Sequence, residues 1–444
     1  MAPAAIKKEG TGFDLPLAIG ILAANEKLYT DLLQDTLIIG ELSLDGTLQN
    51  IKGVLPITIT AKQNHFKRII VPAGNVNEAA VVKGIEVLGF RKLKDVINFL
   101  NRKECEIVRE SDIKKNRSFT EGNIDFSDVK GQENAKRAME IAACGSHNII
   151  LIGPPGTGKT MLSKRFPTIL PPMTEEEALE TTKIHSVAGL MEPGEGIMMN
   201  RPFRSPHHSS SEAALIGGGS VPRPGEISLA CNGCLYLDEF PEFRRHTLEL
   251  LRQPLEEKQI VISRVNGSIT YPANFILVAS MNPCPCGYYT HPTHPCTCTE
   301  WEIKKYLSKL SGPLMDRIDI HVSVSPVDIS KLTSDHIPES SADIRKRVIA
   351  GRNIQTERFR NIGNIHCNSQ MDGRLLRKFC VLDSEAKDLL GFTVRKYGSS
   401  ARTYDRILKV SRTIADLEQR EKISAQDIAE AIQYRCLEKK DWGA

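Results

Sequence analysis

The chain has 444 residues, of which 41% are hydrophobic and 25% charged, and its formal net charge is only +4. At roughly 100–200 residues per domain this length predicts about three domains. The composition is that of an ordinary globular protein, which excludes wholesale disorder. A chain so close to neutral also excludes a surface that is basic throughout, so any nucleic-acid contact must be a local patch.

Neither a membrane span nor a secretory signal is expected. The longest apolar run, Leu15–Ala24, has about half of the ~20 residues needed to cross a bilayer. The first ten residues, MAPAAIKKEG, lack the apolar core of a signal peptide. Eleven cysteines without an export signal favour a reducing compartment. We therefore expect a cytoplasmic protein with no membrane contact and no disulfide framework.

Four regions follow one another along the chain. Residues 1–100 alternate short apolar stretches with helix-like segments, which predicts a compact α/β or α+β domain. Residues 101–122 carry many charges and little periodicity, as expected of a linker. Residues 123–330 alternate β-rich and helical stretches, the pattern of a parallel sheet covered by helices. Residues 331–444 show helical periodicity alone, which predicts a helical C-terminal domain. The expected fold class is α/β.

A glycine-rich segment after the apolar stretch 148–152 matches a phosphate-binding loop. Its glycines allow backbone N–H groups to turn towards a phosphate. Lys159 would supply positive charge for the β- and γ-phosphate oxygens, and the hydroxyl of Thr160 would bind Mg²⁺. ATP and Mg²⁺ are therefore the expected cofactors. The loop consists of Gly153, Pro154, Pro155, Gly156, Thr157, Gly158, Lys159 and Thr160.

Polar residues follow two further β-rich stretches. Asp238 and Glu239 come directly after an apolar stretch, and open α/β sheets bind ligands at the carboxyl ends of their strands. By itself this pair could be a solvated loop. Downstream of a phosphate-binding loop, we expect Asp238 to hold Mg²⁺ with Thr160 and Glu239 to polarise the attacking water. Asn282 ends the next stretch and could orient the same water as a sensor of the γ-phosphate.

Three arginines are candidates for contact with that phosphate. Arg317 lies between two aspartates just before a β-rich stretch. It is either part of a surface salt bridge, worth under ~1 kcal/mol, or an arginine finger for a neighbouring subunit's nucleotide, worth ~10³–10⁵ in rate. Arg402, at the start of a predicted helix, could reach the nucleotide from the C-terminal domain. Arg406, one turn later, is the alternative to Arg402.

These elements, in this order, resemble the AAA+ ATPases. The strings DFSDVKGQ from Asp125, RPFRSPHHSSSEAALIGGGSVPRPGEISLA from Arg201 and SGPLMDRID from Ser311 resemble the magnesium-chelatase-like ATPases of the YifB/ComM type, over essentially the whole chain. The resemblance implies an insertion in the second helix of the AAA+ core, a hairpin before the sensor strand, and a hexameric ring that uses ATP to move along DNA. It also implies a role in branch migration during recombination in natural transformation. The DNA bound would be single-stranded, forked or branched, and a recombinase is a candidate partner.

The expected hairpin is visible in the sequence. β-branched runs at 259–264 and 268–271 flank Asn266-Gly267, a strong hairpin signal. In a ring pore, Arg264 would contact the DNA backbone. An exposed edge hairpin with a solvated arginine is the other interpretation. His207 and His208 lie in the expected helix insertion, and we interpret them as packing or hydrogen-bonding residues rather than metal ligands.

Four cysteines form two close pairs in one short polar segment. They are Cys284, Cys286, Cys296 and Cys298. Four thiolates suit tetrahedral Zn²⁺, and a segment with so little apolar content would gain order from a metal. A loop of free thiols is the alternative. Elsewhere, Cys231 and Cys234 lie on the stretch that leads to Asp238, so we interpret them as small buried hydrophobic residues.

Residues 1–100 resemble the proteolytic domain of Lon, through GTGFDLPLAIGILAA, GELSLDGTLQNIKGVLP and KRIIVPAGN. That domain uses a serine activated by a lysine, and a nucleophile without its base is inert. Gly12 and Leu55 fall at those two positions, so no peptidase activity is expected. The family usually has more Lon-like sequence upstream, so the domain is expected to be incomplete at its N-terminus.

The sequence thus predicts an ATP-driven DNA motor that is active as a hexamer, because Arg317 must act in trans. A magnesium-chelatase subunit is the first alternative; it shares the motor and ordinarily lacks the Lon-like region. A Lon-type peptidase remnant, or a scaffold without DNA activity, is the second alternative.

Overall fold

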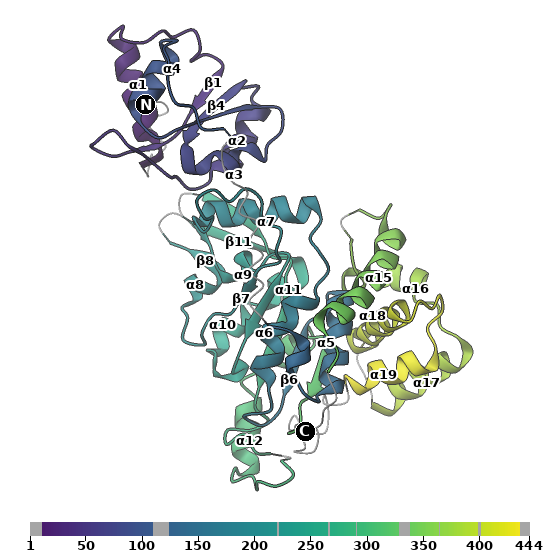
Figure 1. The fold of residues 1–444 in the computed structure, drawn as a ribbon. Coiled ribbons are helices and arrows are strands. Elements are labelled where there is room, and N and C mark those ends of the chain that lie inside the picture. Colours follow the sequence, from purple (N-terminus) through teal and green to yellow (C-terminus); the bar gives the residue numbers. More distant parts are fainter. Residues whose placement is uncertain are drawn as a thin grey trace. The chain divides into compact units, whose positions relative to one another are not determined.

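The computed structural model describes residues 11–109, 124–219, 222–264, 267–289, 291–327, 338–363, 365–397 and 401–435. The chain divides into two compact units (Figure 1). Unit 1 comprises residues 1–120 and 173–200, and unit 2 comprises residues 121–172 and 201–444. Within the described residues, no helix combines the length and the apolar character that a bilayer span requires.

Unit 1 is built on a three-stranded parallel sheet with the order β1-β4-β5. Its apolar strand residues are buried between helices on the two faces. The strands are β1 (Thr36–Ile38), β4 (Arg68–Pro72) and β5 (Glu86–Phe90), with a small antiparallel pair β2 (Glu41–Leu42) and β3 (Leu48–Gln49). The helices are α1 (Asp14–Ala24), α2 (Val54–Gln63), α3 (Val76–Ala80), α4 (Leu93–Leu100) and α7 (Glu175–Ala188).

Helix α7 belongs to unit 1 although its sequence lies in the region that we assigned to the ATPase core. It begins with a capping box, in which Thr174 and Glu177 satisfy each other's backbone N–H groups. Near its end, the Ser186 hydroxyl hydrogen-bonds buried Glu78, and the Ser186 carbonyl accepts from the backbone N–H of Gly53 at 3.0 Å. These contacts join positions far apart in the chain, so no local sequence pattern could predict them.

Unit 2 contains a five-stranded, fully parallel sheet with the order β14-β6-β13-β10-β7. The apolar strands are buried on both faces, as expected when helices cover a parallel sheet. Ile149 and Leu151 face one hydrophobic core, and Ile150 between them faces the other. The predicted α/β class with a parallel sheet is confirmed. The strands are β6 (Ile149–Ile152), β7 (Phe203–Arg204), β10 (Cys234–Leu237), β13 (Ile276–Met281) and β14 (Ile320–Ser323).

Helices and two hairpins surround this sheet (Figure 1). The helices are α5 (Glu133–Gly145), α6 (Lys159–Ile169), α8 (Glu212–Ile216), α9 (Glu226–Leu229), α10 (Arg245–Glu249), α11 (Arg252–Glu257), α12 (Glu300–Leu307) and α13 (Gly312–Met315). One hairpin pairs β8 (Gly217–Gly218) with β9 (Arg223–Pro224) between α8 and α9, and the other pairs β11 (Gln259–Arg264) with β12 (Gly267–Pro272) before β13.

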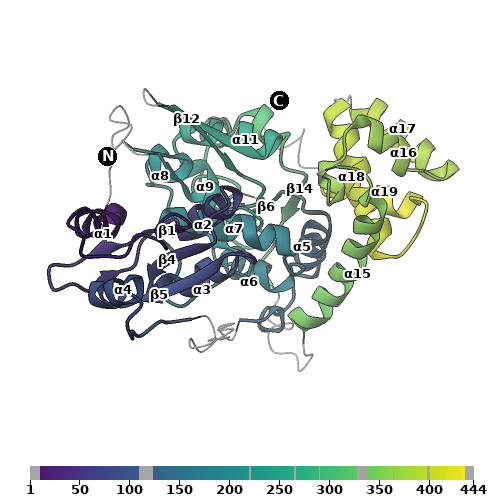
Figure 2. The same cartoon turned by 90° about the horizontal axis from the view of Figure 1, so that it is seen from above.

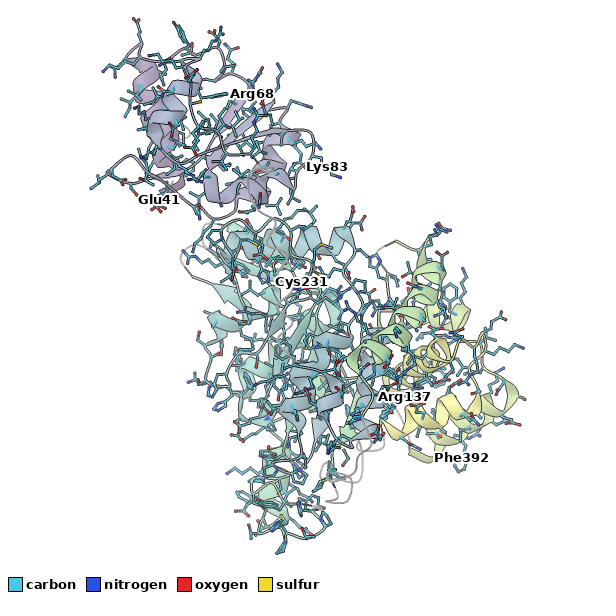
Figure 3. All side chains as sticks on the ribbon, viewed as in Figure 1. Glu41, Arg68, Lys83, Arg137, Cys231 and Phe392 are labelled. Carbon is cyan, nitrogen blue, oxygen red and sulfur yellow. The ribbon has the colours of Figure 1, made fainter. Side chains whose placement is uncertain are left out.

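In the C-terminal part of unit 2, the described residues from 338 onward form helices and no strand, in line with the predicted helical domain, and Figure 2 shows these helices beside α5. Arg137 of α5, labelled in Figure 3, pairs with Glu418 at 2.9 Å and Glu430 at 3.1 Å, which ties the core to these helices. The helices are α15 (Ser341–Phe359), α16 (Gly373–Phe379), α17 (Ser384–Tyr397), α18 (Ala401–Leu417) and α19 (Ala425–Gln433). We call this part the helical lid.

Candidate nucleotide-binding site

Three neighbouring strands of unit 2 end at the same edge of the sheet. Gly153 follows β6, Asp238 follows β10 and Asn282 follows β13. Because β6 and β10 both pair with β13 in parallel register, these three residues meet at one edge. The carboxyl edge of an open parallel sheet is where such folds bind ligands. The structure therefore brings the predicted loop, acidic pair and sensor into one site.

The phosphate-binding loop leads from β6 directly into α6. Gly156 and Gly158 have φ values of +77° and +88°, a region that favours glycine. A side chain at Gly153 would lie 2.1 Å from the carbonyl oxygen of Val324. Backbone N–H groups at the start of α6 are available to an anion, as at other helix N-termini. The sequence thus specifies a loop shape that can close around a phosphate.

Lys159 is held inside this loop. Its Nζ donates to the carbonyl oxygens of Gly153 at 2.6 Å and Pro154 at 2.7 Å, and to Oδ1 of Asn282 at 3.2 Å. Burial lowers the pKa of Lys159 to about 8, and the nearby charge of Asp238 only partly opposes this shift. The ammonium group is therefore mostly charged at pH 7 and loses its charge as the pH rises through about 8.

This pKa predicts that ATP affinity decreases as the pH rises. A triphosphate binds the ammonium form of Lys159, and a group with a pKa of about 8 loses that form as the pH passes 8. Between pH 7 and pH 9 the apparent dissociation constant for ATP should rise about tenfold. Titration of a fluorescent ATP analogue at each pH measures this. Lys159→Arg, whose guanidinium stays charged, should bind with a flat pH profile; a wild-type profile equally flat would contradict the assignment.

Two hydroxyl groups donate hydrogen bonds to the Asp238 carboxylate. Thr160 Oγ1 donates to Asp238 Oδ2 at 2.9 Å, and the hydroxyl of Ser280 donates to Oδ1. Burial alone would raise the pKa of this carboxyl group, but the hydrogen bonds from Ser280 and Thr160 outweigh it and the pKa is lowered. A hydroxyl oxygen and a carboxylate oxygen side by side are hard oxygen ligands of the kind that Mg²⁺ prefers. Thr160 and Asp238 therefore fit the metal that accompanies ATP.

Glu239 directly follows Asp238, and its side chain is exposed. Its backbone has a φ of +50°, uncommon for a residue with a side chain, and its side chain is 59% exposed. His208 Nε2 lies 3.5 Å from Glu239 Oε2, and the ring of His207 packs 4.1 Å from that of His208. An exposed carboxylate beside the metal ligands can polarise a water molecule.

Sequence reasoning missed two members of the site, Ser280 and His208. The signal for Ser280 was available, because residues 280 and 282 share one face of a strand. Ser280 therefore points to the same side as Asn282. His208 is separated from Glu239 by most of a helical insertion and a whole strand, and nothing local indicates their contact.

The predicted arginines lie near the amino ends of the strands, opposite the carboxyl ends where the phosphate-binding loop is found. Arg317 is buried, with its Nη1 donating to the carbonyl oxygen of Pro313 at 2.6 Å and its Nη2 paired with Glu256. Asn148, the residue immediately before β6, donates from its Nδ2 to the Arg317 carbonyl at 3.0 Å. This hydrogen bond fixes Arg317 beside the start of β6. The phosphate-binding loop begins after the last residue of that strand, roughly 15 Å away by strand rise.

Arg402 and Arg406 gather near the same edge. Arg406 pairs with buried Asp319, which precedes β14. The pKa of Glu256 is lowered, first by its hydrogen bond with Arg317 and further by the charges of Arg402 and Arg406. Across the described residues, no hydrogen bond or ion pair joins these three arginines to the phosphate-binding loop of their own chain.

The hairpin β11–β12 forms as the sequence predicts, with Ser263 and Ser268 paired across it. Arg264 is the last residue of β11 and pairs with Gly267. The side chain of Arg264 and the hairpin tip at 265–266 lie outside the part that the structure describes.

The four clustered cysteines come together in unit 2. Cys284 Sγ lies 3.4 Å from Cys286 Sγ and 3.7 Å from Cys296 Sγ, and all four sulfur atoms, including that of Cys298, are within 4.8 Å of one another. By contrast, Cys231, labelled in Figure 3, and Cys234 are fully buried, as interpreted, and Cys234 lies in a hydrophobic core of unit 2. No disulfide joins the cysteines of the described residues.

The structure also describes Gly12 and Leu55, the two positions that correspond to the serine and the lysine of the Lon proteolytic domain. Gly12 lies in a short 3₁₀ turn, Thr11–Phe13, and Leu55 is fully buried in α2. The backbone N–H of Leu55 donates to Glu78 Oε1 at 2.9 Å. Neither residue offers a hydroxyl nucleophile or an amine base, and the expected lack of peptidase activity stays a prediction.

The sheet order, the phosphate-binding loop after β6, the acidic pair after β10, the polar residue after β13 and the helical lid together define an ATPase of the AAA+ class. Family models for magnesium chelatase match most of the chain. "Magnesium chelatase, subunit ChlI" matches residues 125–332, "Magnesium chelatase, subunit ChlI C-terminal" matches 338–435, and "Subunit ChlI of Mg-chelatase" matches 1–75. The chain belongs to the magnesium-chelatase-like ComM/YifB family.

Individual relatives agree with this assignment. The chain is 44% identical to "Competence protein ComM" of Haemophilus influenzae, over 98% of this chain and 85% of that protein. It is 42% identical to the YifB protein of Escherichia coli, over 99% of this chain and 85% of YifB. Similarity to the "Magnesium-chelatase 38 kDa subunit" of Cereibacter sphaeroides is lower, at 28% over 36% of this chain and 52% of that subunit.

Proposed function

We propose that the chain is an ATP-hydrolysing motor that acts on DNA as a hexameric ring, with hydrolysis at the seams between subunits. The placement of the arginines carries this proposal. Arg317, Arg402 and Arg406 lie near one edge of the sheet, and Lys159 and Asp238 lie at the other. No rearrangement of a side chain spans roughly 15 Å of strand. A second subunit can present its arginines to the loop, which makes a closed ring the natural assembly.

In this proposal each group has one role. Lys159 neutralises charge on the β- and γ-phosphate oxygens. Thr160 and Asp238 would hold Mg²⁺, which would supply further positive charge to those oxygens. Glu239 accepts a proton from the attacking water, and Asn282 orients that water. Arg317 of the neighbouring subunit stabilises the charge that develops on the transferred phosphoryl group. Arg402 is the candidate from the helical lid for the same nucleotide, with Arg406 as its alternative.

DNA is the polymer that we propose the ring moves along. In the sequence, the hairpin β11–β12 lies between β10, which the acidic pair follows, and β13, which Asn282 follows. A displacement of the hairpin can therefore be coupled to the state of the nucleotide. Arg264 is its candidate phosphate contact. One of the relatives that align with nearly the whole chain is named a competence protein. From the resemblance to this family we propose single-stranded, forked or branched DNA as the substrate, a recombinase as a partner and the cytoplasm as the compartment.

A magnesium-chelatase subunit is the second candidate function. Matches to chelatase family models favour it, including one over residues 1–75. That match weakens the argument that chelatase subunits lack this region. Against it, the chelatase subunit aligns with only 36% of the chain, whereas ComM aligns with 98%.

DNA-stimulated ATPase activity separates the two functions. We expect forked DNA to stimulate ATP turnover at low salt, and Arg264→Ala to lose the stimulation while retaining the basal rate. A matched control is Arg252→Ala, a partly exposed arginine on α11 outside the hairpin. Because phosphate contacts are lost as salt rises, the stimulation should decline steeply between 50 and 200 mM salt. No binding and no stimulation at low salt would contradict the DNA function and favour the chelatase.

We infer that Zn²⁺ occupies the site formed by Cys284, Cys286, Cys296 and Cys298. The convergence of four sulfur atoms within 4.8 Å supports this cofactor over a loop of free thiols. The metal has a structural role in this proposal, because four protein ligands leave no position open for a substrate.

A further inference from the structure

We propose that the four-cysteine segment is a brace for the nucleotide site: its metal fixes the loop against which the phosphate-binding loop rests. The proposal builds on the zinc site and the ATP site proposed above, and adds a coupling between them.

The sulfur atoms are spaced as a tetrahedral zinc site requires. Sγ–Sγ distances are 3.4 Å for Cys284–Cys286, 3.7 Å for Cys284–Cys296 and 3.5 Å for Cys286–Cys296. Zn–S bonds of about 2.3 Å in a tetrahedron give sulfur separations of about 3.8 Å. Only small movements would close the four sulfurs around one ion.

Backbone donors already point at these sulfurs. The N–H of Cys286 donates to Cys298 Sγ at 3.3 Å, and the N–H of Tyr289 donates to Cys284 Sγ at 3.3 Å. Hydrogen bonds of this kind orient ligands around a metal and favour the thiolate form that binds it. Cys284 is fully buried, and the other three cysteines of this cluster are partly buried. The segment is thus built into unit 2.

The turn between the cysteines touches the phosphate-binding loop. Gly287 has a φ of +87°, and a Cβ placed on it would lie 2.7 Å from Cδ of Pro155 and 3.8 Å from Cγ of Asn282. Its N–H donates to the Cys284 carbonyl at 3.0 Å, so the turn is closed on a proposed zinc ligand. A methyl group at this position would have to displace the loop that holds Lys159.

Two further connections reach Asn282. Cys284 follows it by two residues, so one proposed ligand and the sensor are on the same short segment. Helix α12 begins immediately after Cys298 with Thr299 as its N-cap, and the hydroxyl of its residue Tyr306 faces the backbone N–H of Asn282. A metal that holds both ends of the cysteine segment therefore restrains Pro155 and Asn282 together. Its loss should weaken nucleotide binding before it unfolds the core.

The first experiment measures zinc in the full-length chain, purified without chelator, by elemental analysis. We expect one zinc per chain in the wild type and none in the double variant Cys296→Ser/Cys298→Ser, while Cys105→Ser, a cysteine of unit 1, keeps its zinc. ATP affinity, measured with a fluorescent analogue, should fall about tenfold in the double variant, since small displacements at a binding site have effects of this size. A wild-type chain without zinc overturns the metal site.

The second experiment separates the brace from the metal. Gly287→Ala should keep one zinc per chain and an unchanged circular dichroism spectrum, yet bind ATP about tenfold more weakly. Gly373→Ala, at a helical glycine with open space around it, should match the wild type in both. Zinc-loaded Gly287→Ala that binds ATP like the wild type overturns the coupling. Wild-type protein that binds ATP no better than Lys159→Ala would instead overturn the proposed ATP site.

Discussion

Replacing Arg317 by alanine is expected to lower the turnover number for ATP by ~10³–10⁵-fold. The apparent affinity for ATP should be nearly unchanged, because Arg317 lies at the far edge of the sheet from its own chain's phosphate-binding loop. In our proposal it acts only on the nucleotide of a neighbouring subunit, and mainly in the transition state. Steady-state ATPase kinetics, with ATP binding measured separately, check both parts of this expectation.

The partner of Arg317 provides the control for a merely structural role. Arg317 is buried and pairs with Glu256, so its loss could also act by disturbing the fold. Glu256→Gln removes the same ion pair but leaves the guanidinium in place. We expect Glu256→Gln to retain wild-type turnover or exceed it. Equal losses in Glu256→Gln and Arg317→Ala would show that the ion pair matters and the finger does not.

The second large effect is expected for Glu239→Gln. If Glu239 is the general base, its amide variant should lose ~10²–10⁴-fold in turnover. ATP and Mg²⁺ should still bind, because Thr160 and Asp238 are untouched and Glu239 takes no part in their hydrogen bonds through its side chain. Single-turnover hydrolysis and equilibrium binding measure the two properties.

Two matched variants interpret that result. Asp238→Asn should weaken Mg²⁺-dependent ATP binding itself, which distinguishes a metal ligand from a base. Glu242→Gln, a nearby exposed carboxylate that pairs with Lys309, should leave turnover unchanged. Normal turnover in Glu239→Gln would remove Glu239 from the mechanism and direct attention to another residue at this edge, with Asn282 and His208 the first to test.

Much of unit 2 could be predicted because its signals are local. The apolar stretch ending at Ile152, the glycines at 156 and 158 and the acidic pair after Leu237 each define a strand end or a turn within a few residues. Parallel strands bring their carboxyl ends to one edge, so the site follows from the topology without knowledge of side-chain contacts. The hairpin at 259–272 was predicted for the same reason.

The remaining features depend on contacts between distant residues. The pairing of His208 with Glu239, that of Arg317 with Glu256, and the grouping of α7 with unit 1 all bring together positions that no short window contains. Local sequence also cannot tell which end of the strands an arginine of the helical lid lies near. Arg402 illustrates this. The sequence predicts that a helix starts there, but it does not indicate what that helix packs against, and only the packing of the helical lid places Arg402 near Glu256.

The most direct test of hydrolysis at a seam mixes two inactive chains. Arg317→Ala has an intact nucleotide site and no finger, and Glu239→Gln has a finger and no general base. If the finger acts in trans, an equal mixture assembled with ATP should recover ATP turnover, up to about a quarter of the wild-type rate for random assembly in a closed ring. A mixture no more active than either parent, with both chains shown to assemble, would contradict the account.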